Sequence, residues 1–166
     1  MSKNKNNKPV WSTRIKKKSS NLFTKVGSSL NIDKRLYKQD IKASIVHVEM
    51  LLKKKIIPLQ VKNKIVWGLK KIFNEISKKK FTFNNQAEDI HMSIEKRLFE
   101  LLGEDAGFIH TARSRNDQVL VDFKLWMMEA TEDIIKEIDT TINLIIKLAE
   151  KNIFNVMPSF THLKNA

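Results

Sequence analysis

Residues 116–157 read NDQVLVDFKLWMMEATEDIIKEIDTTINLIIKLAEKNIFNVM and contain neither glycine nor proline. Apolar side chains recur there at steps of three or four residues, which is the period of one face of an α-helix. That face consists of Val119, Phe123, Met127, Ala130, Ile134, Ile138, Ile142, Ile145 and Ala149. At ~1.5 Å per residue a helix over most of this stretch is about 50 Å long, whereas a compact chain of this length has a radius of gyration of only about 15 Å. The sequence therefore predicts a helix from a long bundle whose other helices come from elsewhere.

Three shorter helices are predicted upstream of this stretch. Apolar residues recur with helical spacing over residues 36–52, 61–76 and 90–101. Pro58 separates the first two stripes and suits the first turn of a helix, and Gly103 is suited to end the third. These segments predict a helical unit that precedes the long helix.

The residues between these helices predict where the helices begin and end, and they predict no strand. Asn85 and Glu88 have the spacing of a capping box before the third helix. Residues 104–115 include Gly107 and follow no sustained period, which predicts a loop. The alternation over residues 81–83 is too short to predict a strand, and the chain has no internal repeat. The predicted fold class is therefore all-α.

The chain is strongly basic, with 31 Lys and Arg residues, 18 Asp and Glu residues and a formal net charge of +13. Residues 1–32 contain eight of the basic residues and no acidic one, so the remaining residues carry only +5. Because most of the basic residues are lysines, which are usually solvated, we interpret the charge as a solvated tail and surface. Nucleic acid is therefore not an expected partner. A nucleic-acid binder, whose affinity would fall steeply with salt, is the alternative.

Composition also limits the class and compartment of the protein. The absence of cysteine excludes disulfides, thiolate nucleophiles, cysteine zinc sites and iron–sulfur clusters. No run of about 18 apolar residues is present, so a membrane is not an expected partner. The basic N-terminus lacks the apolar segment of a secretory signal. We expect a cytoplasmic protein.

The composition changes near residue 33, and the pattern changes again near residue 113. Residues 1–32 are rich in Lys, Asn and Ser and are predicted to form an extended basic arm. Residues 33–112 are predicted to form an N-terminal helical domain. Residues 113–166 are predicted to form the truncated start of a central helical-bundle domain.

One polar cluster, His110–Gln118, lies where the chain enters the long helix and includes two arginines with Ser, Thr and Asn. Ser114 and Asp117 have the spacing of a helix cap, which is one interpretation. The other interpretation is a carboxylate or phosphate site. Backbone N–H groups and the helix dipole favour anions at a helix N-terminus, and arginine binds a carboxylate through two N–H groups. Both interpretations stay open.

Two further clusters contain histidine. His162, in the segment of residues 158–163 after the long helix, is a candidate general acid or base, because histidine changes protonation near neutral pH. A purely structural histidine is the alternative. Residues 88–91 read EDIH, but no second histidine follows His91 at i+4 and no other ligand cluster is close in sequence, so no metal site is expected. Helix-start acids beside a surface histidine are the simpler interpretation.

These residues resemble the N-terminal part of the argininosuccinate lyases, in the fumarase/aspartase superfamily. The resemblance begins near Trp11 and runs to Ala166, and only ten residues precede Trp11, so no long leader is expected. Its most specific segment is Arg113–Gln118. The other matching segments are Ser29 before Asp33, Asp40-Ile41, Glu88–His91, His110–Val119 and Pro158–Leu163.

The resemblance implies the β-elimination of argininosuccinate to arginine and fumarate, the last step of arginine biosynthesis, without a metal ion or an organic cofactor. It implies a catalytic proton-transfer role for His162. It also implies substrate contacts from Ser29, Asn116 and Thr161, with Ser114 and Arg115 in the same anion-binding stretch. General acid–base catalysis contributes about 10²–10⁴-fold, so fixed donors must stabilise the charge that develops on the substrate carboxylate.

The sequence departs from the family pattern beside the matched residues. Ala112 and Ser159 stand where the family usually has Gly. If either position needs a positive φ, the side chain costs about 1 kcal/mol. Phe160, Lys164 and Asn165 replace a usual Tyr, Gln and Arg, and residues 11–15 read WSTRI instead of WGGRF.

The family also implies segments and partners beyond these residues. Its members continue through the rest of the bundle, a later flexible loop supplies a catalytic serine, and the sites are assembled from several subunits of a homotetramer. We therefore expect this chain alone to be inactive and to associate with copies of itself or with a complementary lyase fragment. A non-catalytic helical assembly module derived from the lyase is the alternative function.

Overall fold

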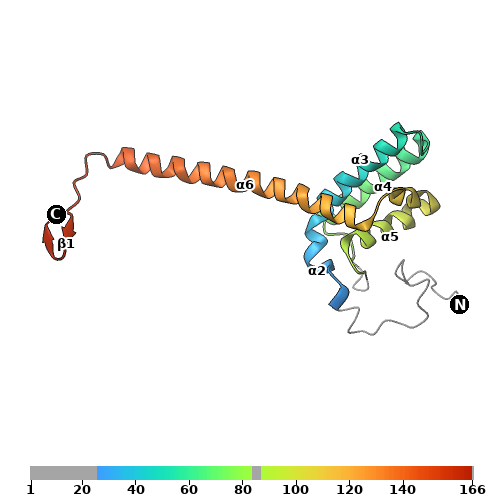
Figure 1. Cartoon of the computed structure of the whole chain (residues 1–166), viewed down its shortest axis with the longest axis horizontal. Helices are drawn as coiled ribbons and strands as arrows, with labels where there is room; N and C mark the ends of the chain where they lie inside the picture. Colours follow the sequence, from blue (N-terminus) through green and yellow to red (C-terminus); the bar gives the residue numbers. More distant parts are fainter. Residues whose placement is uncertain (1–25, 84–86, 166) are drawn as a thin grey trace. The chain divides into compact units, whose positions relative to one another are not determined.

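The computed structural model describes residues 26–83 and 87–165, and the predicted all-α class is confirmed (Figure 1). The helices are α2 (Leu30–Asp33), α3 (Tyr37–Lys53), α4 (Leu59–Ser77), α5 (Ile90–Leu102) and α6 (Arg115–Lys151). Two 3₁₀ segments, η2 (Lys34–Leu36) and η3 (Gly103–His110), and two short strands, β1 (Phe160–Thr161) and β2 (Lys164–Asn165), complete the described elements.

The chain divides into two compact units, Met1–Trp126 and Met127–Ala166, and the boundary falls inside α6. The predicted domain boundary at residues 112 and 113 stays a prediction. The predicted basic arm, residues 1–32, differs from the structure at its end, because residues 30–32 belong to α2 and Leu30 is buried. Residues 1–25 of that arm lie outside the described residues.

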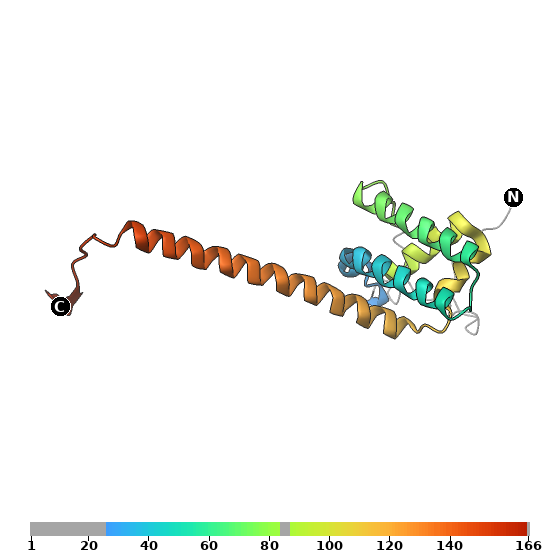
Figure 2. The same ribbon diagram turned by 90° about the horizontal axis from the view of Figure 1, so that it is seen from above.

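Helices α3, α4 and α5 form the core of the first unit, and α3 and α4 lie side by side (Figures 1 and 2). Each helix places an apolar stripe inside, as its spacing predicted. The buried apolar residues are Leu30, Ile41, Val48, Leu51, Ile57, Ile65, Leu69, Ile72, Ala87, Ile90, Ile94, Leu98, Ala106 and Ile109. Burial of these side chains is the main force that stabilises the unit.

Glycine and proline act at three points of this unit. Pro58 is the residue before α4. Gly68 lets α4 approach α5, because a Cβ at this position would lie 2.6 Å from Cδ1 of Leu98. Gly103 ends α5 with φ +63°, a backbone conformation that favours glycine. The predicted roles of Pro58 and Gly103 are confirmed.

Two expectations near α5 differ from the structure. The N-terminal cap of α5 is Asp89, whose Oδ1 accepts a hydrogen bond from the backbone N–H of Met92 at 2.6 Å, and not Asn85, which lies outside the described residues. Residues 103–110 form the 3₁₀ segment η3 rather than a loop, with Ala106 and Ile109 buried against the core. Short 3₁₀ turns have no long apolar period, which explains why the sequence predicted a loop.

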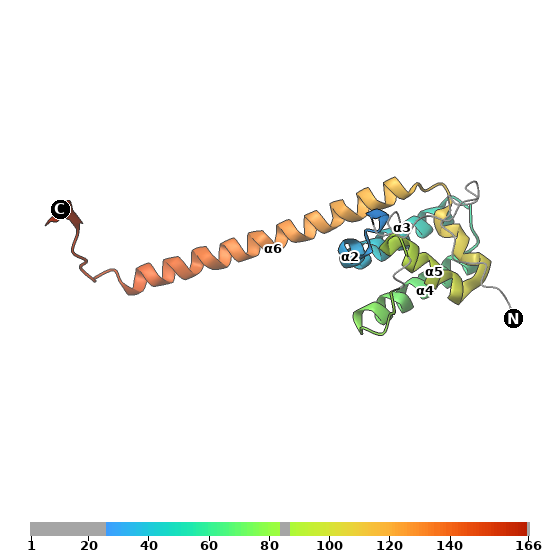
Figure 3. The ribbon, with the colours of Figure 1, turned by 90° about the horizontal axis from the view of Figure 1, so that it is seen from below.

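The second unit holds the C-terminal part of α6 and a small hairpin (Figure 3). Helix α6 ends at Lys151, earlier than the predicted stretch, and the Asn152 side chain donates to the carbonyl of Leu148 at this end. Strands β1 and β2 pair antiparallel, with Thr161 opposite Lys164. No strand was predicted here, since two residues are too few for an alternating pattern.

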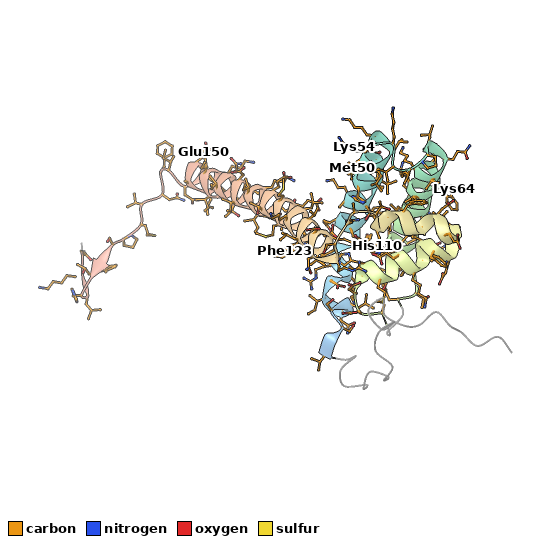
Figure 4. The ribbon with its side chains drawn as sticks, turned by 45° about the vertical axis from the view of Figure 1, so that its right-hand side comes forward. Met50, Lys54, Lys64, His110, Phe123 and Glu150 are labelled. Carbon is orange, nitrogen blue, oxygen red and sulfur yellow. The ribbon has the colours of Figure 1, made fainter. Side chains whose placement is uncertain are left out.

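The apolar stripe of α6 is exposed along the second unit. Ile134, Ile138, Ile142 and Ile145 keep between 48% and 61% of their surface exposed. Figure 4 labels Phe123 and Glu150 on α6 and shows side chains on all sides of the helix. An apolar face of this extent is typical of a surface that another element covers.

Candidate functional site

The first turn of α6 begins with a reciprocal cap. The Ser114 Oγ accepts from the backbone N–H of Asn116 at 3.3 Å, and Oδ2 of Asp117 accepts from the backbone N–H of Ser114 at 3.3 Å. This is the helix cap that the spacing of Ser114 and Asp117 predicted. Ser114 and Asn116 are both exposed, so the cap leaves this end of the helix open to solvent.

The Arg115 side chain is already bound by carboxylates. Its two terminal nitrogens donate to Oε1 and Oε2 of Glu95 at 2.7 and 3.0 Å, and its Nε lies 3.5 Å from Oδ2 of Asp89. Glu95 also lies 2.8 Å from Nε2 of His110. Although burial opposes the charge, these carboxylates raise the pKa of Arg115 above its ordinary value. A substrate carboxylate would have to replace Glu95 to use this guanidinium.

Ser29 lies at the start of α2, beside the start of α5. Its backbone N–H donates to the carbonyl of Glu88 at 2.8 Å, and its Oγ donates to Oδ2 of Asp33 at 2.5 Å. Oδ1 of Asp33 accepts from the backbone N–H of Ile90 at 3.1 Å. These bonds fix the segment that contains Ser29 against the first turn of α5.

The start of α5 joins the two groups of predicted site residues in the first unit. Glu88 holds Ser29, while the adjacent Asp89 caps α5 and faces Arg115. Ser29 and Arg115 therefore contact two adjacent residues, Glu88 and Asp89. At the start of α6 the helix cap is observed, and the anion-site interpretation of the same segment stays a prediction.

The backbone before α6 contains a left-handed residue. Ala112 has φ +53°, whereas Ser159, the other position where the family usually has Gly, does not have a positive φ. His47 Nε2 donates to the carbonyl of Thr111 at 3.0 Å, and Arg113 donates to Oγ of Ser44 at 2.8 Å. These two contacts with α3 hold the residues on either side of Ala112.

Thr161 and His162 belong to the second unit, in the hairpin. His162 and Leu163 form its two-residue turn with φ +48° and +64°, the pattern of a type I′ turn. Thr161 and His162 are exposed. The structure therefore presents both side chains on the surface of the hairpin, Thr161 from β1 and His162 from the turn.

A buried polar cluster lies behind the start of α6. His91 Nδ1 is 3.2 Å from Oδ1 of Asp40 and 3.5 Å from Oδ2 of Asp122. The Gln118 side-chain amide donates to the same Oδ1 of Asp40 at 2.6 Å. Asp40, His91 and Asp122 are each at most 1% exposed. The prediction that His91 is a surface residue is wrong.

The three ionisable groups of this cluster change one another's pKa values. Burial and the neighbouring Asp40 charge raise the pKa of Asp122 to about 8. Burial also opposes the charges on His91 and Asp40. Their mutual hydrogen bond and attraction outweigh it, so the pKa of His91 is raised and that of Asp40 is lowered. Near neutral pH the favoured state is a charged Asp40–His91 pair beside a protonated Asp122.

These three residues also have the donor types that bind a transition metal ion. Sequence reasoning found no second ligand close to His91 along the chain, whereas the fold brings Asp40 of α3 and Asp122 of α6 beside it. Sequence reasoning missed the cluster because its members lie on three helices. The only signal was the polar Asp40, His91 and Asp122 within otherwise apolar helical stripes.

Residues 13–166 match the model of a family described as Lyase. The chain belongs to the lyase family. This lyase chain is 59% identical over 166 residues to argininosuccinate lyase of Pelagibacter ubique, a match that covers all of the chain and 36% of that protein. It is 43% identical over 157 residues to argininosuccinate lyase of Bartonella bacilliformis, a match that covers 95% of the chain and 34% of that protein.

The predicted resemblance to argininosuccinate lyase is confirmed, and the lineage is that of a carbon–nitrogen lyase. The lyase chain spans about a third of the length of these curated relatives. Among its described helices, none combines the length and the apolar character that a membrane span requires.

Proposed function

We propose that this lyase chain supplies one part of an argininosuccinate lyase active site, which cleaves argininosuccinate to arginine and fumarate. The similarity to two argininosuccinate lyases supports the reaction. The observation that supports the site is that Ser29 and Arg115 contact the adjacent residues Glu88 and Asp89 at the start of α5. A cytoplasmic location and a role in arginine biosynthesis stay predictions.

In this proposal the first unit binds the carboxylate end of the substrate. The Asn116 amide is an exposed donor at the start of α6, where the helix dipole and hydrogen bonds stabilise negative charge. The exposed Ser29 hydroxyl donates to Asp33, so it would contact the substrate only after it leaves that carboxylate. Arg115 contributes its positive charge and binds the substrate directly only if Glu95 is displaced. Fixed donors of this kind stabilise the charge that develops on the carboxylate when the neighbouring carbon loses its proton.

The hairpin of the second unit supplies the proton-transfer groups. Breaking the C–N bond requires that a proton leave the carbon beside the carboxylate and that another reach the departing nitrogen. We assign a proton-transfer role to the imidazole of His162 and a substrate contact to the hydroxyl of Thr161. Both lie at an exposed hairpin tip, which is suited to reach a site on another chain. No metal ion or organic cofactor is needed for these steps.

The rest of the site comes from further lyase segments. Copies of this chain, or chains that carry the remaining bundle helices, would cover the exposed face of α6. The resemblance implies a homotetramer with a serine from a later loop, so we expect the isolated chain to be inactive.

Substitution of Asn116 tests the binding role. In an assembly of this chain with the remaining lyase segments, Asn116→Ala should weaken argininosuccinate binding by about ten-fold or more, because it removes a donor to a charged group. The backbone N–H groups at this helix start remain, so the assembly should still form. The readout is substrate affinity by calorimetry, with sedimentation to confirm assembly.

The matched control is Asn143→Ala, an exposed asparagine on the same helix whose side chain donates to the carbonyl of Asp139. It should leave substrate affinity unchanged. Equal affinity in the Asn116→Ala and Asn143→Ala assemblies would return Asn116 to a purely structural role at the helix start.

A further inference from the structure

The fully buried residues at the start of α6 are polar. Within the described part of α6 the buried residues are Gln118 and Asp122. The neighbouring Val119, Leu120, Val121 and Phe123 keep between 42% and 53% of their surface exposed. Leu125 and Trp126 are half-buried, so apolar contacts contribute as well, but the fully buried contacts of this helix start are polar.

Both buried residues of α6 lead to the same partners. Gln118 donates to Oδ1 of Asp40 at 2.6 Å, and Oδ2 of Asp122 lies 3.5 Å from Nδ1 of His91. His91 in turn lies 3.2 Å from Asp40. One cluster thus joins α3, α5 and α6 in the interior of the unit.

The cluster holds more acceptors than donors. Both carboxylate oxygens of Asp122, Oδ2 of Asp40 and Nδ1 of His91 are buried without a hydrogen-bond partner among the described residues, although Nδ1 lies 3.2 Å from Oδ1 of Asp40. One oxygen of each aspartate lies within 4.8 Å of the other and of His91 Nδ1. Two ionised carboxylates at this distance repel each other, and an unpartnered buried charge is strongly unfavourable. Protons that the groups share resolve both problems.

We propose that Asp40, His91 and Asp122 are positioning residues that share protons and thereby hold the start of α6 against α3 and α5. His91 carries one proton between the two aspartates, and Asp122 carries a second proton and stays neutral. The buried pair of Asp40 and His91 is then balanced in charge. The same anchor holds Ser114, Arg115 and Asn116 in place for substrate, a consequence that rests on the proposed function.

Most of the charged groups around the cluster favour this state. Asp89 at the start of α5 adds negative potential at His91 and supports its protonation. Arg113, which precedes α6, supports the ionised form of Asp40. Its positive charge opposes the proton on Asp122, but burial and the charge of Asp40 outweigh this effect. The Arg115 guanidinium lies between Glu95 and Asp89, and the negative charge of Asp40 also helps to raise its pKa. The amide of Gln118 supports the ionised form of Asp40.

The sign of the pH dependence follows from the two protons. The folded state holds protons on Asp122 and His91 at pH values where the unfolded chain has released them. Stability from these groups is therefore complete at low pH and is lost as pH rises through the folded values, up to about pH 8 for Asp122. Because the pKa of Asp40 is lowered in the folded state, its contribution to stability is present at neutral pH and is lost only in acid. The anchor should weaken between about pH 5 and about pH 9.

Hydrogen exchange on the full chain tests the proposal. The readout is the protection factor of the backbone amides of residues 115–126, measured by mass spectrometry, with α4 as the reference for the folded state of the same unit. In the wild-type chain this protection should fall by about ten-fold or more from pH 5 to pH 9, while the protection of α4 changes less.

Two substitutions separate shared protons from simple packing. Asp122→Asn keeps the shape of a neutral Asp122, so protection at neutral pH should be retained. Its fall toward pH 9 should become smaller, because only the proton on His91 is then lost as pH rises. His91→Asn removes the positive partner of Asp40 and should lower the protection of residues 115–126 by about ten-fold or more throughout this pH range. Asp133→Asn, at an exposed position of α6, is the control and should change neither value.

Three results would overturn the proposal. One is a wild-type protection factor that does not change with pH, and another is an Asp122→Asn chain with the wild-type pH profile. The third is a rise in wild-type protection on addition of Zn²⁺ that Asp122→Asn abolishes, which would assign the cluster to a metal ion. The exchange result concerns contacts within this chain, so a failure of the proposed lyase activity would leave it unchanged.

Discussion

Ala112 is an L-residue in a backbone conformation that favours glycine. Its φ of +53° is the left-handed conformation in which the Cβ of an L-residue is crowded, and the resemblance implied Gly at this position. His47 and Arg113 hold the adjacent backbone, so the conformation persists despite the side chain. Ser159 replaces a second usual Gly at a backbone position without a positive φ and carries no such strain.

Ala112→Gly should stabilise the first unit. Removing Cβ relieves about 1–2 kcal/mol of strain, of which the greater freedom of glycine in the unfolded chain offsets about 0.5–1 kcal/mol. The free energy of unfolding should therefore rise by about 0.5–1 kcal/mol in urea denaturation at neutral pH. Ser159→Gly, the matched control, should bring no gain. An Ala112→Gly chain that is less stable than the wild type would show that position 112 is not strained.

The residues that sequence analysis found and missed differ in how local their signals are. The cap formed by Ser114 and Asp117 was predictable because both members lie within one turn. The cap of α5 was misplaced, since Asp89 lies beside other polar residues that also suit a helix start. The pairing of Asp122 with His91 was not predictable, because only the packing of α5 and α6 brings these two residues together.

At the scale of elements, α6 differs from every other helix of the described chain. Helices α3, α4 and α5 bury their apolar stripes against one another, as their periodicity predicted. The buried residues of α6 are polar, and its own apolar stripe is exposed. Periodicity identified the stripe of α6 correctly but could not show which partner covers it.

The exposed stripe of α6 should make the chain associate. Covering isoleucines that are about half exposed contributes about 1 kcal/mol or more for each side chain. In sedimentation equilibrium the double variant Ile138→Gln/Ile145→Gln should therefore raise the dissociation constant at least about ten-fold. The control, Thr140→Gln/Asn143→Gln, changes the opposite face of the helix and should associate like the wild type. A wild-type chain that stays monomeric, or equal weakening in both variants, would contradict this account.

At the scale of the whole molecule, the candidate site residues fall into two groups. Ser29 and the segment of residues 114–116 belong to the first unit, and Thr161 and His162 belong to the hairpin of the second. Residues of this lyase chain match about a third of the length of its curated relatives, so most of such an enzyme lies in other segments. We interpret the two groups as contributions to active sites that several chains complete.

The most direct test of this account is fumarate release from argininosuccinate by the chain alone and after addition of a polypeptide that carries the remaining lyase segments. We predict no release by either polypeptide alone and measurable release by the mixture. His162→Asn should abolish that release, and Asn152→Ala, at an exposed asparagine beyond the end of α6, should not. Release by the isolated chain, or a mixture whose activity is the same with His162→Asn, would contradict the account.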